Sequence, residues 1–433
     1  MSTADLHARV ATIDITPGLG LRLGGRESAR VGRWVHSTLE LNVVVLTSLT
    51  GSCCFVSVDS LYAGKELTNT IVAAAKRYFH IPKSCVVVAA SHTHSAPNID
   101  QSKPRLGPVD VGYRDAILAK VTKTLRQLSD APARPVEIFA GVHECHAAVS
   151  RRRFWPVPRL GRRGLVGPGF IMAPSQKTLN DPFVRTMSLV DVNQREEICC
   201  IWSYACHPTG LPFADCFSAD YVGEVRGEVR RSADPGCAVL FLQGFSGDVR
   251  PPSRTPTAYE HAKAIVTGPR FYRMSAAEWR GWAREISMAV ITARNTAQRR
   301  TASERFLIGG GEVELPLRTI LPPAPVEKML TWKRLALYEG QRILAVNAEP
   351  LNQWIEIVGS KEQESDQWCV GCEGDVFGYL PTSRTLVEGG YEAEGFKRSF
   401  GVNGAFVPVP EEICAAKLTE QKSEWPAHFC GGT

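Results

Sequence analysis

The sequence contains no long hydrophobic run. Within its 433 residues, no window approaches the roughly 18 uninterrupted apolar residues that a membrane-spanning helix needs. The first residues, MSTADLHARVATID, include Asp5, His7 and Arg9 and have no continuous apolar segment, unlike a secretory signal. These absences predict a cytoplasmic protein without a transmembrane segment.

Internal repeats, low-complexity linkers and a disulfide pattern are also absent. The 13 cysteines are an odd number and include the neighbours Cys53-Cys54 and Cys199-Cys200, unlike the disulfide framework of a small secreted domain. We interpret them as mostly reduced thiols. The segment Cys369-Val-Gly-Cys372 has the spacing of a redox pair or of half a zinc knuckle. It lacks the βαβ context or the second cysteine pair that these sites need, which favours a structural role.

Charge of one sign is not in large excess, since the formal net charge is only +6. The arginines are unevenly spread, however, and the segment RRRFWPVPRLGRRG, residues 151–164, interleaves six of them with Phe154 and Trp155. Its prolines and glycines predict a loop rather than a helix that enters a nucleic-acid groove, so we expect no nucleic-acid partner. Two interpretations stay open, a solvated loop and a rim that attracts an anionic substrate.

Hydrophobic periodicity predicts an α/β protein, with mixed β-sheets flanked by helices. The predicted strands cover residues 39–48, 53–58, 86–90, 197–204, 238–243, 306–317 and 343–346. The predicted helices cover residues 66–79, 113–128, 221–231 and 351–360, with more within 257–298. We expect one domain over residues 1–433, with a subdivision near 303 into 1–302 and 303–433.

Histidines follow two of the predicted strands. The run 86–90 leads into Ser91-His-Thr-His, and the period of two in an extended chain points His92 and His94 to the same side. The run 197–204 leads to His207-Pro208, and the run 238–243 leads through small residues to Asp248. Functional groups in α/β proteins gather at the carboxyl ends of strands, so this pattern favours a metal site over chance core histidines. Asp248 is a candidate turn former, a role that is compatible with a functional one.

Together these segments resemble the zinc-dependent neutral ceramidase family. The resemblance is carried by Ile13-Asp-Ile-Thr-Pro17, Ser91-His-Thr-His-Ser95, Val149-Ser-Arg151, His207-Pro208, Ser218-Ala-Asp220, Gly247-Asp-Val249, Asn347-Ala-Glu349, Gly378-Tyr-Leu-Pro381 and Gly389-Gly-Tyr-Glu392. It implies the fold of the family's catalytic domain. The residues after Tyr391 are too few for the family's carboxyl-terminal immunoglobulin-like domain, since such a sandwich takes about 100 residues.

The resemblance also implies one Zn²⁺ per chain and a set of site residues. The implied metal ligands are His92, His207, Glu349 and Tyr391. The metal would activate water and polarise a carbonyl group. His94 would act as general base and then as acid toward the leaving amine. Arg151 would stabilise the oxyanion or hold a substrate anion, and Asp248 of the Gly-Asp element completes the predicted catalytic set.

One departure from the family pattern bears on the reaction. The family serine to which a nucleophilic role is assigned is replaced by Arg250, and an arginine cannot act as that nucleophile. Attack would then fall to zinc-activated water. We expect Arg250, Arg152 and Asp220 to bind substrate, and the arginines favour an anionic one. The alternative is that Arg250 pairs internally with Asp248 or Asp220.

Three functions follow from these features. The first is a zinc-dependent hydrolase of a small linear amide, an N-acyl amine or N-acyl amino compound that is anionic or amphiphilic. The second is a zinc-dependent hydrolase of an ester or a lactone instead of an amide. The third is a non-catalytic, ceramidase-like binding protein, which the presence of all four implied ligands disfavours. None of these patterns specifies the oligomeric state.

Overall fold

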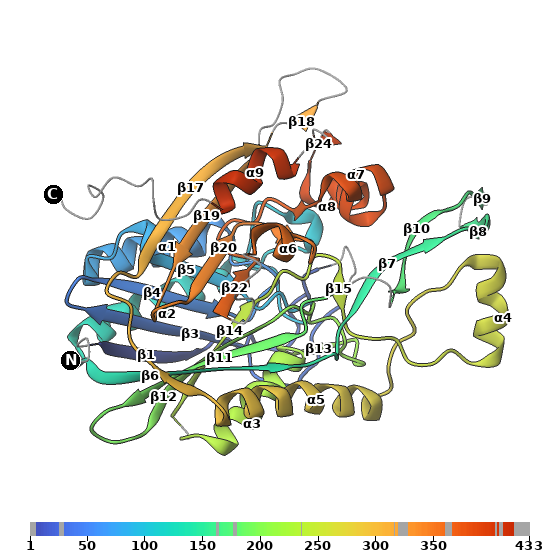
Figure 1. Ribbon diagram of the computed structural model, residues 1–433. Coiled ribbons are helices and arrows are strands. Elements are labelled where there is room, and N and C mark those ends of the chain that lie inside the picture. Colours follow the sequence, from blue (N-terminus) through green and yellow to red (C-terminus); the bar gives the residue numbers. More distant parts are fainter. Residues whose placement is uncertain are drawn as a thin grey trace.

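The computed structural model (Figure 1) describes residues 6–25, 30–161, 164–175, 180–234, 236–315, 317–318, 328–359, 366–402, 405–406 and 410–419. Its largest sheet has the order β14-β12-β11-β6-β1-β3-β4-β5, and β16 pairs with β6. The strands of one half are β1 His7–Asp14, β3 Glu40–Ser48, β4 Gly51–Val58 and β5 Val86–Ala90. Those of the other half are β6 Arg134–Glu144, β11 Phe183–Asp191, β12 Glu197–Tyr204, β14 Ala238–Gln243 and β16 Gln298–Arg300.

This sheet is bent so that its two halves face each other. The strand pairing that joins the two halves is that of His7 and Ala8 of β1 with Pro135 and Arg134 of β6. Strand β14 packs against β3, β4 and β5, which belong to the opposite half. Each half contains one parallel pair, β4 with β5 and β12 with β14. The carboxyl ends of these strands therefore bring the predicted site residues from both halves together.

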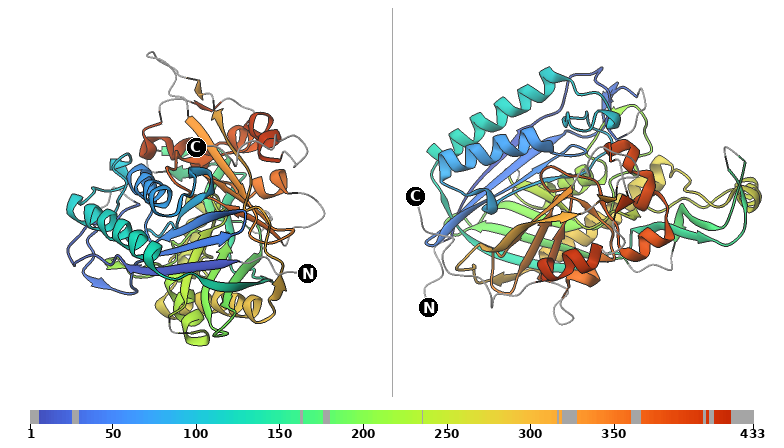
Figure 2. Two further views of the ribbon diagram at one scale, coloured as in Figure 1. Left: turned by 90° about the vertical axis from the view of Figure 1, so that its left-hand side faces the viewer. Right: turned by 90° about the horizontal axis from the view of Figure 1, so that it is seen from above.

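Helices cover the outer faces of both halves (Figure 2). Helices α1 Gly64–Phe79 and α2 Val111–Asp130 cover the first half, and α3 Tyr221–Ser232 and α5 Ala276–Asn295 cover the second. In α1, Leu67, Ile71 and Ala75 recur every four residues and are buried. With helices outside and the other half inside, strands such as β12 are buried on both faces and consist mostly of apolar residues. The prediction of mixed sheets flanked by helices is confirmed.

A separate four-stranded sheet lies between the free edges of the bent sheet, β14 and β5. Its order is β17-β19-β20-β22, with β17 Leu307–Leu315, β19 Lys328–Leu335, β20 Arg342–Val346 and β22 Gln367–Val370. After β22, the amide of Gly371 donates to the carbonyl of Gln243 in β14, and the amide of Ala90 in β5 donates to the carbonyl of Cys372. The predicted structural role of the Cys369–Cys372 segment agrees with this placement. The twelve described cysteines are buried free thiols.

A second hydrophobic cluster lies under the carboxyl-terminal elements. It includes Leu330, Trp354 and Phe396, whereas the main cluster fills the bent sheet. Its surroundings are β18 Leu317–Arg318, β21 Glu349–Pro350, β23 Tyr379–Leu380, β24 Ala405–Phe406, α6 Trp354–Val358, α7 Ser383–Glu388, α8 Lys397–Phe400 and α9 Pro410–Thr419. Phe245 belongs to this second cluster and Trp368 to the first, so both portions of the chain contribute to each core. The subdivision near residue 303 stays a prediction.

A β-hairpin projects from the body of the protein (Figure 1). It consists of β7 Val149–Trp155 and β10 Gly169–Ser175, with β8 Arg159–Gly161 and β9 Gly164–Val166 at the tip and α4 Ala258–Thr267 beside it. The predicted loop over residues 151–164 is therefore wrong. Pro156 and Pro158 fall between β7 and β8, and Gly161 at the end of β8 pairs with Gly164 at the start of β9, so none of them interrupts a pairing strand. We call residues 153–161, 164–175 and 254–273 the arm.

Two further strand pairings involve short strands. Strand β2 Trp34–Val35 pairs with β13 Cys216–Phe217, and β15 Val249–Arg250 pairs with β7. The latter pairing attaches the base of the hairpin to the turn that follows β14. Among the described helices, none is both long enough and apolar enough to cross a bilayer.

Candidate metal centre

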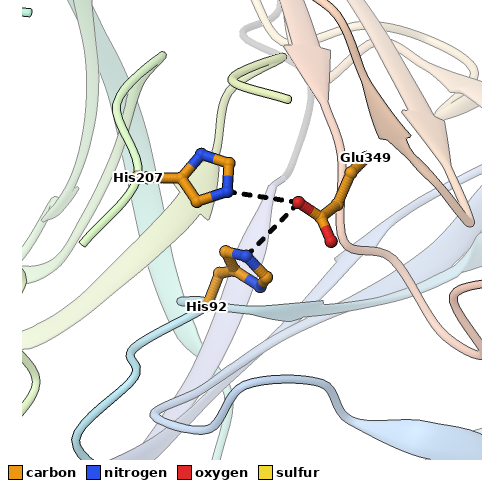
Figure 3. A group of neighbouring side chains, drawn as sticks. All are labelled: His92, His207 and Glu349. Carbon is orange, nitrogen blue, oxygen red and sulfur yellow. Dashed lines mark ion pairs between the residues drawn. The ribbon is translucent and has the colours of Figure 1, made fainter. Parts of the chain in front are cut away.

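Three buried side chains from distant parts of the chain converge on one point (Figure 3). His92 follows β5, His207 follows β12, and Glu349 begins β21. The Nε2 atoms of His92 and His207 lie 3.4 and 3.2 Å from the same atom, Oε2 of Glu349. One ligand atom from each of the three side chains lies within 4.8 Å of the other two. Each half of the bent sheet thus supplies one imidazole, and the chain after β20 supplies the carboxylate.

The local backbone makes this convergence sterically feasible. His92 has a φ of 65°, a left-handed conformation that is costly for a residue with a side chain and that turns the chain away from β5. A Cβ atom on Gly247 would lie 2.7 Å from the carbonyl oxygen of Glu349. Only glycine at this position allows the turn after β14 to approach β21, where its amide donates to the carbonyl of Pro350 at 2.8 Å.

Hydrogen bonds fix the proton positions on both imidazoles. Nδ1 of His92 lies 2.9 Å from the carbonyl oxygen of Leu61, and Nδ1 of His207 lies 2.7 Å from that of Ser246. A carbonyl oxygen only accepts hydrogen bonds, so each Nδ1 carries a proton, and Nε2 of the neutral ring keeps its lone pair. Metal-binding histidines are oriented by second hydrogen bonds of this kind.

The donor set fits a metal cation. Among the described residues, Nε2 of His92, Nε2 of His207 and Oε2 of Glu349 are buried and take part in no hydrogen bond. With neutral imidazoles, three atoms that bear lone pairs face one another, which costs free energy unless a cation or a proton lies between them. Two imidazoles and a carboxylate also hold the metal in several catalytic zinc sites, which keep a further position open. These three predicted ligands therefore form a group that could hold a metal.

Electrostatic interactions keep the carboxylate of this group ionised. Burial alone would raise the pKa of Glu349, but the adjacent His92 and His207 hold it well below the usual range of a glutamate. Burial lowers the pKa of His207 to about 4. Both groups are then in the form that binds a metal. Burial would lower the pKa of His92, but the charge of Glu349 raises it well above its usual range, so a metal that binds here displaces a proton from His92.

The second oxygen of Glu349 has a partner of its own. The hydroxyl of Tyr62, which follows β4, donates a hydrogen bond to Oε1 of Glu349. The Tyr62 ring also packs on the imidazole of His92, with 5.1 Å between the ring centroids. Burial, reinforced by the charge of Glu349, raises the pKa of Tyr62 well above its usual range, so the phenol remains a donor. Tyr62 thus engages Oε1 and leaves Oε2 facing the histidines.

Replacing Tyr62 with phenylalanine is expected to weaken metal binding about 10- to 100-fold, the usual effect of losing a partner that orients a ligand. The zinc dissociation constant, measured by competition with a chromophoric chelator, tests this. Tyr113→Phe is the matched control, because the Tyr113 hydroxyl donates instead to the carbonyl of Ile15, at 2.7 Å. Equal zinc affinities of Tyr62→Phe and the wild type would contradict the orienting role.

His94 lies beside the group of His92, His207 and Glu349 that could hold a metal, but it is not part of that group. Its ring centroid is 5.1 Å from that of His92 and 6.4 Å from that of His207, and its side chain is partly exposed. The backbone of Gly25 passes close to it, since a Cβ atom there would lie 2.4 Å from Nδ1 of His94. This placement between solvent and the buried ligands suits a group that transfers protons.

Arg151 and Tyr391 pack together near Glu349. The guanidinium carbon of Arg151 lies 5.5 Å from the ring centroids of both Tyr391 and Tyr379, and Nη2 donates to the Tyr379 hydroxyl at 3.0 Å. Burial raises the pKa of Tyr391, and the charge of Glu349 raises it further, so a phenolate there needs a nearby cation. The role of Tyr391 as a fourth ligand stays a prediction.

Comparison with solved structures identifies the architecture. The neutral ceramidase from Pseudomonas aeruginosa matches with a TM-score of 0.71, over 97% of this chain and 74% of that chain. This chain has the fold of the neutral ceramidases. A structure described as a ceramidase complexed with C2 matches with a TM-score of 0.67, over 97% of this chain and 75% of that chain. Sequence identity is 14% in both cases, so the likeness is one of fold. No protein-family model and no curated protein sequence matches the chain.

Buried acceptors surround Arg152, and its role in substrate binding stays a prediction. Its Nη1 donates to Glu392 at 2.8 Å, and its Nη2 donates to Glu388 at 3.1 Å and to the carbonyl of Gly389 at 2.9 Å. Nε of Arg151 binds the other oxygen of Glu392, at 2.7 Å. A buried guanidinium needs a carboxylate partner, and Glu392 neutralises much of this charge before any substrate arrives.

Replacing Glu392 with glutamine is expected to lower the free energy of unfolding by about 3–5 kcal/mol, because two buried guanidinium groups lose their shared carboxylate. Denaturant-induced unfolding of the metal-free protein measures the change. Glu394→Gln, in the same turn but with a largely exposed side chain that pairs with Lys397, should have little effect. Equal stability of the two variants would show that the buried pairs contribute nothing.

Both predicted aspartates bind backbone amides. Oδ1 of Asp248 accepts a hydrogen bond from the amide of Asn352 at 2.7 Å, which joins the turn after β14 to the chain after β21. Asp220 caps α3 by accepting from the amide of Tyr221 at 2.7 Å. Burial raises the pKa of both, to about 6 for Asp220. Asp248 therefore positions the segment that carries Glu349. Asp220 is the N-cap of α3, and its role in substrate binding stays a prediction.

Arg250 lies at the base of the projecting hairpin. Its backbone pairs with Val149 of β7, and its guanidinium carbon lies 4.2 Å from the ring centroid of Phe271, a cation–π contact. Asp248 and Asp220 were the predicted internal partners of Arg250. Asp248 accepts a hydrogen bond from the amide of Asn352, and Asp220 accepts one from the amide of Tyr221. A substrate-binding role for Arg250 stays a prediction.

Three residues of this region were not predicted from the sequence: Tyr62, Tyr379 and Glu392. Tyr62 follows β4, the parallel neighbour of β5, so the strand-end argument that selected His92 could have found it. Tyr379 and Glu392 lie in two of the segments that carry the family resemblance, but their contact with Arg151 depends on tertiary packing.

Proposed function

We propose that this protein is a zinc-dependent hydrolase of a linear amide, an N-acyl amine or N-acyl amino compound that carries an anionic group. The observation that supports it most is the convergence of three buried, unbonded ligand atoms from His92, His207 and Glu349, with both Nδ1 atoms bound to carbonyl oxygens. The ceramidase-like fold supports the same class of bond, because the matched structures are ceramidases.

The chain's own residues account for the proton transfers. Zinc in such a site activates water and polarises a carbonyl group. His94, partly exposed beside the ligands, accepts a proton from the attacking water and returns it to the nitrogen as the carbon–nitrogen bond breaks, which yields a carboxylic acid and an amine. Among the described residues, the hydrogen bonds of Arg151 engage Nε and Nη2. We assign its Nη1 to the oxygen on which negative charge develops.

The proposed anionic group has a candidate binding position. A depression of about 310 Å³ opens beside Tyr391, and its lining includes Gly25, Arg105 and Arg398. Both arginine side chains are exposed, and Nη1 of Arg105 donates to the carbonyl of Arg398 at 2.7 Å. Gly25 places this depression next to His94. Two cationic side chains that line the depression favour an anionic substrate end there.

Replacing Arg105 with alanine is expected to raise KM for an N-acyl amino acid about fivefold and to leave KM for the matching neutral N-acyl amine unchanged, since one exposed charge contributes up to about 1 kcal/mol. Steady-state kinetics on the two substrates measures the difference. Lys123→Ala, an exposed change on α2, is the matched control. An equal rise for both substrates would contradict anion recognition by Arg105.

Metal removal tests the proposed function itself. Protein treated with a chelator should lose hydrolysis of N-acyl substrates and regain it when zinc is added. Matched amide and ester pairs with the same acyl group distinguish the proposed amidase from the esterase or lactonase alternative, because polarising a carbonyl serves either bond. Elemental analysis that finds no metal would favour a non-catalytic binding protein with this fold.

A further inference from the structure

The arm concentrates exposed apolar side chains. Among the described residues, nine of the eighteen large hydrophobic side chains that are exposed belong to it: Phe154, Val157, Leu160, Leu165, Val166, Met172, Tyr259, Ile265 and Val266. Leu165 at the tip and Tyr259 on α4 are 77% and 74% exposed. Apolar side chains that gather in this way on one projecting part indicate a binding surface, whereas isolated ones need no explanation.

Helix α4, the helix of the arm, has ten residues and buries none of its side chains. A helix this short gains little stability by itself in water, and most helices depend on burying one face. A capping box between Thr257 and Glu260 holds its first turn, and Gly268 at its end packs against the side chains of Arg159 and Ile171. The helix is thus attached to the hairpin while Ile265 and Val266 stay exposed.

The charge of the arm is almost entirely of one sign. It contains six basic residues and a single acidic one, Glu260, which pairs with Arg254 at 2.8 Å. The exposed basic side chains are Arg153, Lys263, Arg270 and Arg273. A surface that combines basic groups with exposed aliphatic and aromatic groups is complementary to a partner that is anionic outside and apolar beneath.

We propose that the arm docks on an anionic lipid surface. A bilayer with anionic headgroups offers negative charge to the basic side chains and an apolar layer to the exposed hydrophobic ones. A second copy of the arm would instead bring like charges together. Nucleic acid would satisfy the basic side chains but would offer nothing to Leu165 or Ile265. Strand β7 continues from the exposed arm to Arg151, which lies beside the metal group. Docking would therefore hold the candidate site next to the surface in which an amphiphilic substrate resides.

Co-sedimentation with vesicles tests the docking. The wild type is expected to sediment with phosphatidylcholine vesicles that contain 30% phosphatidylserine, and not with pure phosphatidylcholine. The double variant Lys263→Glu/Arg270→Glu should bind at least about tenfold more weakly, since each basic side chain near an anionic surface contributes about fivefold. Leu165→Ser/Ile265→Ser should also weaken binding. All four side chains are exposed, so the fold should be unaffected.

Lys123→Glu and Leu49→Ser, both exposed and outside the arm, are the matched controls and should bind like the wild type. Metal-free protein should bind equally well, so failure of the proposed reaction and failure of docking are distinguishable. Wild-type protein that ignores the anionic vesicles, or arm variants that bind like the wild type, would overturn the proposal. An arm-dependent dimer in sedimentation velocity, or arm-dependent retention of nucleic acid, in the absence of vesicle binding would assign the arm to that partner instead.

Discussion

Replacing His207 with alanine is expected to abolish zinc retention and to reduce kcat/KM about a thousandfold or more. A metal that polarises the scissile group contributes several kcal/mol to the transition state, and each 1.36 kcal/mol is a factor of ten in rate. His207 supplies one of the three convergent ligand atoms, and its Nδ1 is already bound to the carbonyl of Ser246. Elemental analysis after gel filtration and steady-state kinetics measure the two effects.

Two controls separate loss of the ligand from loss of the fold. His146→Ala removes an imidazole whose side chain is 75% exposed and should leave zinc content and activity unchanged. Metal-free wild type is the reference for stability, and the His207→Ala variant should melt near the same temperature. A variant that keeps one zinc per chain and full activity would show that His207 is not a ligand.

Replacing His94 with glutamine is expected to lower kcat by about 10²- to 10⁴-fold while zinc content stays the same. General acid–base groups contribute rates of this size, and His94 lies outside the group of convergent ligand atoms. This pattern differs from that of His207→Ala, in which metal and activity disappear together. Parallel metal analysis and single-turnover kinetics distinguish the two roles.

Gly25→Ala tests the proton-transfer role of His94 by displacing its ring instead of removing it. A Cβ atom at Gly25, whose φ is +87°, would lie 2.4 Å from Nδ1 of His94 and would displace the ring. The account predicts a loss of kcat in the direction of His94→Gln, again with zinc retained. If His94→Gln released the metal, His94 would be a ligand and not a proton-transfer group.

The strands that carry the site were predictable because both of their faces are buried. The predicted ranges 86–90, 197–204 and 238–243 coincide with β5, β12 and β14. Helices on one side and the facing half-sheet on the other favour apolar residues at most positions, so the apolar runs coincide closely with the strands. The polar residue after such a run then marks the site, as it does for His92 and His207.

Features that depend on tertiary contacts were not predictable in this way. The helix predicted over 351–360 is Trp354–Val358, in part because the amide of Asn352 is bound to Asp248, and residue 360 lies outside the described residues. The arginine-rich segment divides between buried ion pairs and an exposed arm, because Glu392 reaches Arg151 and Arg152 from the far end of the chain. Neither the residue spacing nor the composition of the segment predicts these ion pairs with Glu392.

A zinc titration of metal-free protein, followed by hydrolysis of an N-acyl amino acid, tests the central claim most directly. The claim is that His92, His207 and Glu349 hold one zinc ion on which activity depends. It predicts no hydrolysis before zinc is added, a linear rise, and saturation at about one equivalent per chain, with no rise in the His207→Ala variant. Full hydrolysis by the metal-free protein would contradict it.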